Sequence, residues 1–243
     1  MNVPLSIQLG LNGSVKRLRP IFLDAGAIGA TSSWAGSYHV LVMGRHYDDY
    51  VVTLRALRFP PIVGLPPAHP YERLTGKIRA AGVTGNIGEA IAAIFATRYL
   101  GARIADVTHI RPRRPFRRRK APDYLMRLGR LMPGVFQDIV PSIGPIPWPM
   151  WWPVESKARS TEAGANAGQR DALRQLVAYW SLLARSRPQV VGFGMIVTFA
   201  YQPPRQIRVA LVIPRNQVRI VQVIEQAGQE VNEPELKTCL YAC

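Results

Sequence analysis

A chain of 243 residues is long enough to bury a hydrophobic core without disulfides or structural metals, as one large domain or as a core with an appendage. Hydrophobic residues make up 48% of the chain, which excludes a disordered protein, although 21 prolines predict many loops. The net charge of +16 favours a polyanionic partner, nucleic acid first, whereas a solvated basic surface explains the same charge without any partner.

The two cysteines, Cys239 and Cys243, lie close together at the end of the sequence. They supply neither a disulfide framework nor a four-ligand metal site, and a reducing compartment fits them best. We expect two free thiols on a frayed terminus, with a disulfide across a small loop as the alternative. The N-terminus lacks the pattern of a signal peptide, and no run reaches the roughly 18 apolar residues of a membrane span. The sequence therefore predicts a cytoplasmic protein with no membrane partner.

Residues 1–80 are predicted to form an accessory region. Two strand-like runs, Tyr38–Met43 and Tyr50–Phe59, are separated by a polar stretch, and this pattern is typical of a hairpin. Five prolines between positions 60 and 70 then mark the clearest boundary in the chain. Residues 81–243 are assigned to a second, core region.

The core region opens with a predicted helix that Asn86 can cap and Gly101 can end, with apolar residues at helical spacing through Leu100. Three short strands are expected next, at 104–110, 123–126 and 154–158. An amphipathic helix, two strands and a last helix complete the order, at 169–185, 190–201, 206–213 and 217–229. This order predicts a mixed α/β class.

Carboxylates and a lysine fall on these elements in a pattern that suits metal chemistry. Asp123 opens the second predicted strand, after Pro122, and Glu155 and Lys157 stand two apart on the third, so their side chains share a face. A neighbouring strand can place Asp123 beside them. Two carboxylates can hold one or two Mg²⁺ ions whose remaining ligands are water. The metal would activate a water, and Lys157 can orient that water or stabilise the transition state.

Taken alone, an acidic-x-Lys triplet is weak evidence. With 15 acidic residues and five lysines, roughly 0.3 such triplets are expected by chance. The chain has a second one, Glu235-Leu236-Lys237, which lies in a polar stretch without a strand pattern and is interpreted as chance. Glu89 follows Asn86 by three residues, so a capping box is sufficient to explain it.

The order of these residues on these elements resembles the PD-(D/E)xK nuclease superfamily over about residues 84–215. The resemblance implies a restriction-endonuclease-like αβββαβ core, with a mixed central sheet flanked by helices. It implies a nuclease that uses Mg²⁺ or Mn²⁺ to hydrolyse phosphodiester bonds of DNA. RNA is the alternative substrate. Asp123 and Glu155 then match the metal ligands and Lys157 the catalytic lysine. Glu89 matches the acidic residue of the first core helix and would assist metal binding.

Gln175 and Tyr179 are similar to the QxxxY motif of the RecB-like branch of this superfamily. Residues four apart share a helix face, from which both can support the site, and an ordinary boundary position is the alternative. Three features depart from the pattern. The spacing from Asp123 to Glu155 is long, and the cysteines that hold an Fe–S cluster in some RecB-like nucleases are absent. No histidine lies in the helix of Glu89, although some members of that branch carry one nearby. A restriction-type endonuclease and a RecB-like exonuclease or repair nuclease both stay open.

Seven basic residues between positions 111 and 120 are expected to contact the phosphate backbone, unless they form a flexible solvated loop. They are Arg111, Arg113, Arg114, Arg117, Arg118, Arg119 and Lys120. Trp148, Trp151 and Trp152 can stack on unpaired bases or pack a local core. The rival functions are a non-catalytic nucleic-acid-binding protein on the same fold and a basic ribonucleoprotein component of another fold. A homodimer is one expected assembly.

Overall fold

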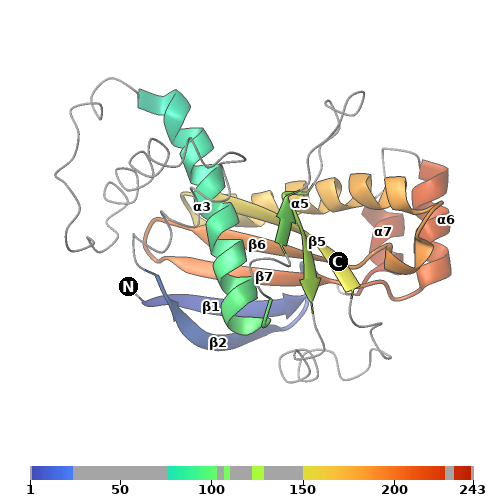
Figure 1. Ribbon diagram of the computed structural model, residues 1–243, viewed down its shortest axis with the longest axis horizontal. Helices are drawn as coiled ribbons and strands as arrows, with labels where there is room; N and C mark the ends of the chain where they lie inside the picture. Colours follow the sequence, from blue (N-terminus) through green and yellow to red (C-terminus); the bar gives the residue numbers. More distant parts are fainter. Residues whose placement is uncertain are drawn as a thin grey trace.

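In a computed structural model of the chain, the structure describes residues 2–23, 76–102, 107–109, 122–128, 150–227 and 233–241. These residues form an α/β protein around one seven-stranded mixed sheet, in the order β2-β1-β7-β6-β5-β4-β3 (Figure 1). The predicted α/β class with a mixed sheet and flanking helices is confirmed. Among the described helices, none has the length and apolar character needed to cross a membrane.

The strands are β1 (Asn2–Leu9), β2 (Val15–Phe22), β3 (Val107–His109), β4 (Tyr124–Leu128), β5 (Met150–Arg159), β6 (Gly194–Ala200) and β7 (Gln206–Val212). Neighbouring strands are antiparallel except for the pairs β1–β7 and β5–β6, which are parallel. The helices are α3 (Gly76–Tyr99), α5 (Glu162–Leu183), α6 (Gln217–Ala227) and α7 (Glu233–Cys239), with a 3₁₀ turn at Pro188–Val190.

Helices α3 and α5 cover opposite faces of β5 (Figure 1). Gly88 of α3 lies against Ala158, whereas Gly168 of α5 lies against the side chain of Lys157, the neighbouring residue on the strand. Successive side chains of a strand point to opposite faces, so the two helices must lie on opposite sides of the sheet. Helix α5 also makes the crossover from β5 to its parallel partner β6, a connection that parallel strands require.

Each face of the sheet has its own hydrophobic core. On the α3 side the largest fully buried side chains include Phe95, Trp152 and Phe199. On the α5 side Leu176 and Trp180 pack with side chains of β6, β7, α6 and α7. Burial of apolar area on both faces stabilises the fold by about 25 cal/mol per Å². Strand β6, which is covered on both faces, is accordingly buried along its whole length.

Helix α3 begins earlier than the sequence indicated. It starts at Gly76, so Asn86 lies inside the helix and the capping-box interpretation of Glu89 is wrong. The predicted end is confirmed, because Gly101 has a positive φ of 63° and the Ala102 N–H donates to the Ala96 carbonyl. A glycine in this conformation satisfies the last carbonyls of a helix without strain from a Cβ atom.

Strands β1 and β2 were not predicted, and they join the main sheet through β7. Pro4 obscures the strand pattern of β1, yet the pairing with β2 is irregular between Val3 and Leu5, so its missing N–H removes no regular ladder bond. The first 23 residues thus differ from the expected accessory region, and the boundary near residue 80 falls inside α3. The predicted runs at 38–43 and 50–59 lie outside the described residues.

The end of the chain also differs from expectation. Cys239 is a free thiol as predicted, but it is fully buried in α7 against the α5-side core, so a frayed terminus is wrong for this residue. Cys243 lies outside the described residues. The triplet Glu235-Leu236-Lys237 lies on α7, not on a strand.

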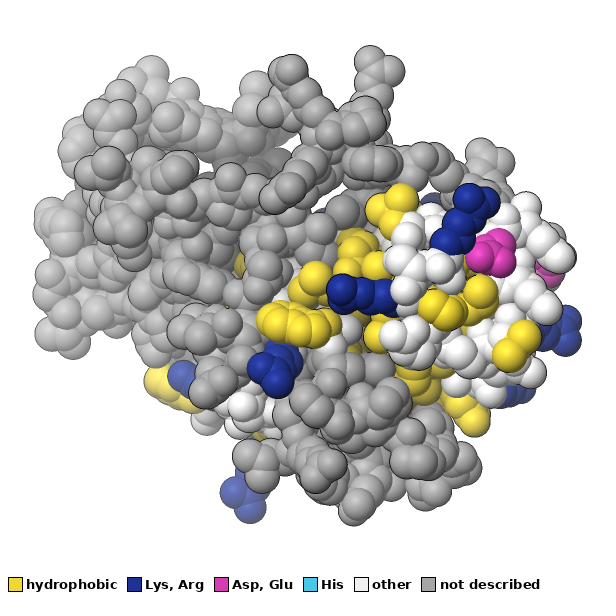
Figure 2. Space-filling model, turned by 45° about the vertical axis from the view of Figure 1, so that its right-hand side comes forward, with side chains coloured by type: hydrophobic (Ala, Val, Ile, Leu, Met, Phe, Trp, Pro, Cys, Tyr) yellow, Lys and Arg dark blue, Asp and Glu magenta, His cyan; other side chains and the backbone are white. Residues whose placement is uncertain are grey.

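On the face drawn in Figure 2, Lys and Arg side chains lie apart from one another among hydrophobic and polar ones, and acidic side chains appear only toward the right-hand side. The net charge of +16 therefore does not gather into one patch on the described part of this face.

Candidate functional site

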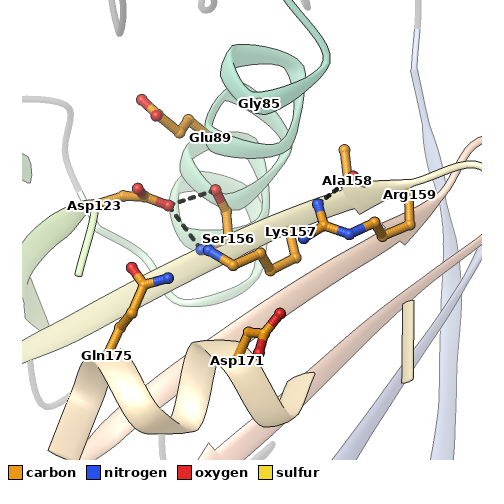
Figure 3. A pocket seen from close by; sticks show the side chains of 9 residues that line it. All are labelled: Gly85, Glu89, Asp123, Ser156, Lys157, Ala158, Arg159, Asp171 and Gln175. Carbon is orange, nitrogen blue, oxygen red and sulfur yellow. Dashed lines mark hydrogen bonds between the residues drawn. The ribbon is translucent and has the colours of Figure 1, made fainter. Parts of the chain in front are cut away.

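Strand pairing places Asp123 beside Glu155. Asp123 immediately precedes β4, and Tyr124 is the register partner of Val154 on β5. The Asp123 N–H donates to Glu155 Oε2 over 3.1 Å. In return the Ser156 N–H and hydroxyl donate to Asp123 Oδ2 over 2.8 and 2.7 Å (Figure 3). Backbone and side-chain hydrogen bonds therefore fix the Asp123 segment against the Glu155–Ser156 segment of β5.

Lys157 completes this group. Its ammonium forms an ion pair with Glu155 Oε1, and the side-chain exposures of the two residues are 14% and 0%. A fully buried carboxylate is tolerated only with partners of this kind, because the loss of hydration is large. The residues predicted as the core of the site, Asp123, Glu155 and Lys157, are thus brought together.

A cavity of about 330 Å³ opens over this group (Figure 3). It lies between α3, the start of β4, β5 and α5. Its lining residues are Gly85, Glu89, Asp123, Ser156, Lys157, Ala158, Arg159, Asp171 and Gln175. Glu155 is not among them, because its side chain is fully buried beneath. The cavity therefore presents carboxylates, a lysine and an amide from four elements to one space.

The cavity perturbs the ionisation of two of its groups. Burial raises the pKa of Asp123, and the nearby negative charge of Glu89 raises it further, against the lowering effects of the Ser156 hydroxyl and Lys157. Burial lowers the pKa of Lys157, and Arg159 adds to this, whereas Asp123, Asp171 and Glu89 oppose it. Perturbed groups that share a cavity are typical of functional sites.

Glu89 reaches the cavity from α3, where its Oε2 accepts a hydrogen bond of 2.9 Å from the Tyr124 hydroxyl. Because Tyr124 directly follows Asp123, this bond ties α3 to the segment that carries the first carboxylate. The predicted role of Glu89 near Asp123 is therefore compatible with its position.

Gln175 and Tyr179 are separated by the structure. Gln175 lines the cavity, whereas Tyr179 packs half-buried against the α5-side core. Burial raises the pKa of the Tyr179 hydroxyl, and Arg187 partly opposes this. Tyr179 lies about 6 Å further along α5 than Gln175, on the side away from Asp171.

Three polar residues of the cavity, Asp171, Ser156 and Arg159, escaped the sequence analysis. Asp171 lies one turn before Gln175 on α5, and its carboxylate is 3.4 Å from a guanidinium nitrogen of Arg174. The i, i+4 spacing to Gln175 was the available signal. Ser156 fixes Asp123, and no sequence pattern marks this role, because it depends on contact between separate strands.

The carboxylates around the cavity are the potential ligands for a divalent metal ion. In the described ranges, no three Asp, Glu, His or Cys side chains are grouped closely enough to hold a metal ion. Mg²⁺, however, often binds proteins through one or two carboxylates and keeps several waters. Asp123 and Glu155 offer carboxylate oxygens on neighbouring strands, and a cation would favour the charged form of Asp123, whose pKa is raised by burial and by the charge of Glu89. These residues fit the chemistry of Mg²⁺ or Mn²⁺.

The residues proposed to hold nucleic acid are only partly described. The basic run from Arg111 to Lys120 and Trp148 lie outside the described residues. Trp152 is fully buried and packs against Phe193 with ring centroids 5.7 Å apart, so it is a core residue and cannot stack on a base. Trp151 points outward with 40% of its surface exposed.

Comparisons with protein-family models, curated proteins and solved structures gave no significant match to this chain.

Proposed function

We propose that this protein is a divalent-metal-dependent nuclease that hydrolyses phosphodiester bonds of DNA, with a PD-(D/E)xK site on a restriction-endonuclease-like core. One observation carries the proposal. The Asp123 carboxylate and the Lys157 ammonium line one cavity, and the buried Glu155 carboxylate beneath it accepts the Asp123 backbone N–H and pairs with Lys157.

The arrangement of the elements supports this fold assignment. The described part of the chain contains α3, β3, β4, β5, α5 and β6 in that order, which is the order αβββαβ. Strands β3, β4 and β5 form an antiparallel meander, and α5 then crosses over to the parallel strand β6. The candidate site lies where the second and third of these strands meet, as the superfamily resemblance implies.

In the proposed reaction, Asp123 and Glu155 hold the metal, and Glu89 assists from α3. A bound Mg²⁺ or Mn²⁺ would supply charge neutralisation at the scissile phosphate and activation of a water. Lys157, when protonated, stabilises negative charge on the phosphate oxygens, and its low exposure strengthens that interaction. Gln175 contributes an uncharged amide that can hydrogen-bond a phosphate oxygen or the attacking water.

The test is cleavage of DNA by purified protein in Mg²⁺ or Mn²⁺ and in EDTA. We expect cleavage that requires the metal and is lost in the double variant Asp123→Ala/Lys157→Ala. Arg219→Ala removes an exposed positive charge outside the cavity, so this control should keep activity. Cleavage that survives in the double variant overturns the assignment.

A non-catalytic nucleic-acid-binding protein on the same fold is the second candidate. The observation in its favour is that Glu155 is fully buried, paired with Lys157 and absent from the cavity wall. This candidate predicts DNA binding without cleavage in Mn²⁺. The same assay therefore separates the two functions.

A further inference from the structure

A second cavity, of about 370 Å³, lies between α5, β7, α7 and the turn that joins β1 to β2. Its lining residues are Leu11, Asn12, Asn166, Gln169, Arg170, Leu173, Arg208, Leu236 and Lys237. None of them lines the cavity above Asp123 and Lys157. The volume falls within the range of about 300–1,000 Å³ that is usual for small-molecule sites.

The charged groups on the wall of this second cavity are all basic. Arg208 is neutralised, because it forms an ion pair with Glu162 and donates a 2.7 Å hydrogen bond to Asn166 Oδ1. Arg170 and Lys237 are exposed, and among the residues that the structure describes neither has an ion-pair or hydrogen-bond partner. Two uncompensated positive charges, from α5 and α7, thus face one cavity. An anionic group bound there would form charge-assisted hydrogen bonds with both.

Polar and apolar groups share the remainder of the wall. The Asn166 amide is oriented by Arg208, which uses its oxygen and leaves the amide nitrogen as a donor. Gln169 is only 4% exposed, and its amide nitrogen has a long contact of 3.4 Å to the Thr198 hydroxyl. Leu11, Leu173 and Leu236 supply the apolar surface. Amide groups can bind the edge of a heterocyclic base, and leucine side chains can contact its face.

We propose that this cavity binds a nucleoside phosphate. The phosphate would lie between Arg170 and Lys237, and the nucleoside would lie against the amides and leucines. A free mononucleotide and the 5′-phosphorylated end of a strand present the same chemistry. The proposal does not depend on the hydrolytic activity proposed for the other cavity.

The test is calorimetric titration of the full chain in EDTA with deoxyadenosine 5′-monophosphate, deoxyadenosine and inorganic phosphate. We expect saturable binding of the nucleotide, with both fragments weaker by at least roughly ten-fold because each makes only part of the contacts. Titration with a 5′-phosphorylated and a 5′-hydroxyl dinucleotide distinguishes the two sources. If a strand end is the natural ligand, the phosphorylated dinucleotide binds more tightly than the mononucleotide. If a free mononucleotide is the natural ligand, the phosphorylated dinucleotide binds less tightly than the mononucleotide.

The double variant Arg170→Ala/Lys237→Ala should weaken nucleotide binding by roughly ten-fold or more, since charge-assisted hydrogen bonds are lost. Asn12→Asp adds a negative charge to the cavity wall and should also weaken nucleotide binding. Arg219→Ala, with the same change of charge as Asn12→Asp at an exposed site outside the cavity, should bind as the parent does. Unchanged affinity in the double variant, or phosphate binding as tight as nucleotide binding, would each overturn the proposal.

Discussion

Burial and a neighbouring carboxylate disfavour the charged form of Asp123. Its carboxylate is buried close to Glu89, and both effects raise its pKa, although the Ser156 N–H and hydroxyl hold the group in place. A raised pKa in the folded state means that Asp123 contributes most to stability below the usual pKa of a carboxyl group. That contribution is lost as the pH rises through the raised value. The charged form of Asp123 thus lowers the stability of the fold, and it is the form that would bind a cation.

The variant Asp123→Asn should therefore be more stable than the parent at neutral pH. The asparagine oxygen can still accept the hydrogen bonds from Ser156, and the buried charge is gone. We expect a rise in Tm of roughly a few degrees at neutral pH, which disappears as the pH falls below the usual carboxyl range. Thermal unfolding followed in EDTA between acid and neutral pH measures this. A matched control is Asp171→Asn, whose parent carboxylate is 48% exposed. A lower Tm for Asp123→Asn at neutral pH would contradict the argument.

Lys157 occupies a place that a metal ion would compete for. Its ammonium pairs with the buried carboxylate of Glu155, one of the two proposed metal ligands. In the variant Lys157→Met the carboxylate keeps its burial and loses its partner, which should destabilise the fold by about 3–5 kcal/mol. Mn²⁺ should then restore stability, because it replaces the missing positive charge.

Thermal unfolding with increasing Mn²⁺ measures the effect in both proteins. At each Mn²⁺ concentration, the rise in Tm should be larger for Lys157→Met than for the parent. The variant should also lose DNA cleavage. Equal shifts in the two proteins would show that Glu155 is not a metal ligand, even if Lys157 is needed for cleavage.

At the scale of elements, the close approach of α3 to β5 positions Glu89 over the site, and Gly88 permits that approach. A Cβ atom at Gly88 would lie 3.1 Å from the backbone nitrogen of Ala158, whereas one at Gly85, a turn earlier, would meet nothing within 4 Å. Both glycines are inside the same helix, so they form a matched pair.

Gly88→Ala should destabilise the protein by about 1–3 kcal/mol, because the helix must move away from the strand. Gly85→Ala should be neutral or should stabilise by up to about 1 kcal/mol, since alanine favours the helix. Chemical denaturation of both variants measures the difference in unfolding free energy. Equal effects at the two positions would mean that helix propensity alone determines the outcome and that the approach of α3 is not limiting.

Local sequence patterns indicated most of the described core elements, and with them the main part of the site. The period-two spacing of Glu155 and Lys157 predicted a shared face, and strand pairing with Tyr124 then set Asp123 beside them. The start of α3 was missed because Gly82 and Gly85 are poor helix formers and Asn86 is a typical capping residue. Strand β1 was missed because Pro4 reads as a strand breaker. The spacing of Asp171 to Gln175 indicated a shared helix face, but the cavity that Asp171 lines exists only after α5 packs on β5.

At the scale of the molecule, the first 23 residues are part of the main sheet. Strand β1 pairs in parallel with β7, and β2 forms the edge beyond it. Val3, Leu5 and Ile7 of β1 are buried in the α3-side core. The sheet therefore depends on a long-range contact between the two ends of the sequence.

Removal of residues 1–23 should consequently do more than delete an appendage. The truncated chain would expose the edge of β7 and the apolar face that β1 covers, and an unpaired edge of this kind promotes aggregation. We expect loss of the cooperative thermal transition, or aggregation in size-exclusion chromatography at concentrations where the full chain is well behaved. The triple variant Val3→Ala/Leu5→Ala/Ile7→Ala keeps the strand and removes most of its core contact, so it should unfold at a lower temperature than the parent. A truncated chain that unfolds cooperatively at the parent Tm would instead establish residues 1–23 as an independent accessory segment.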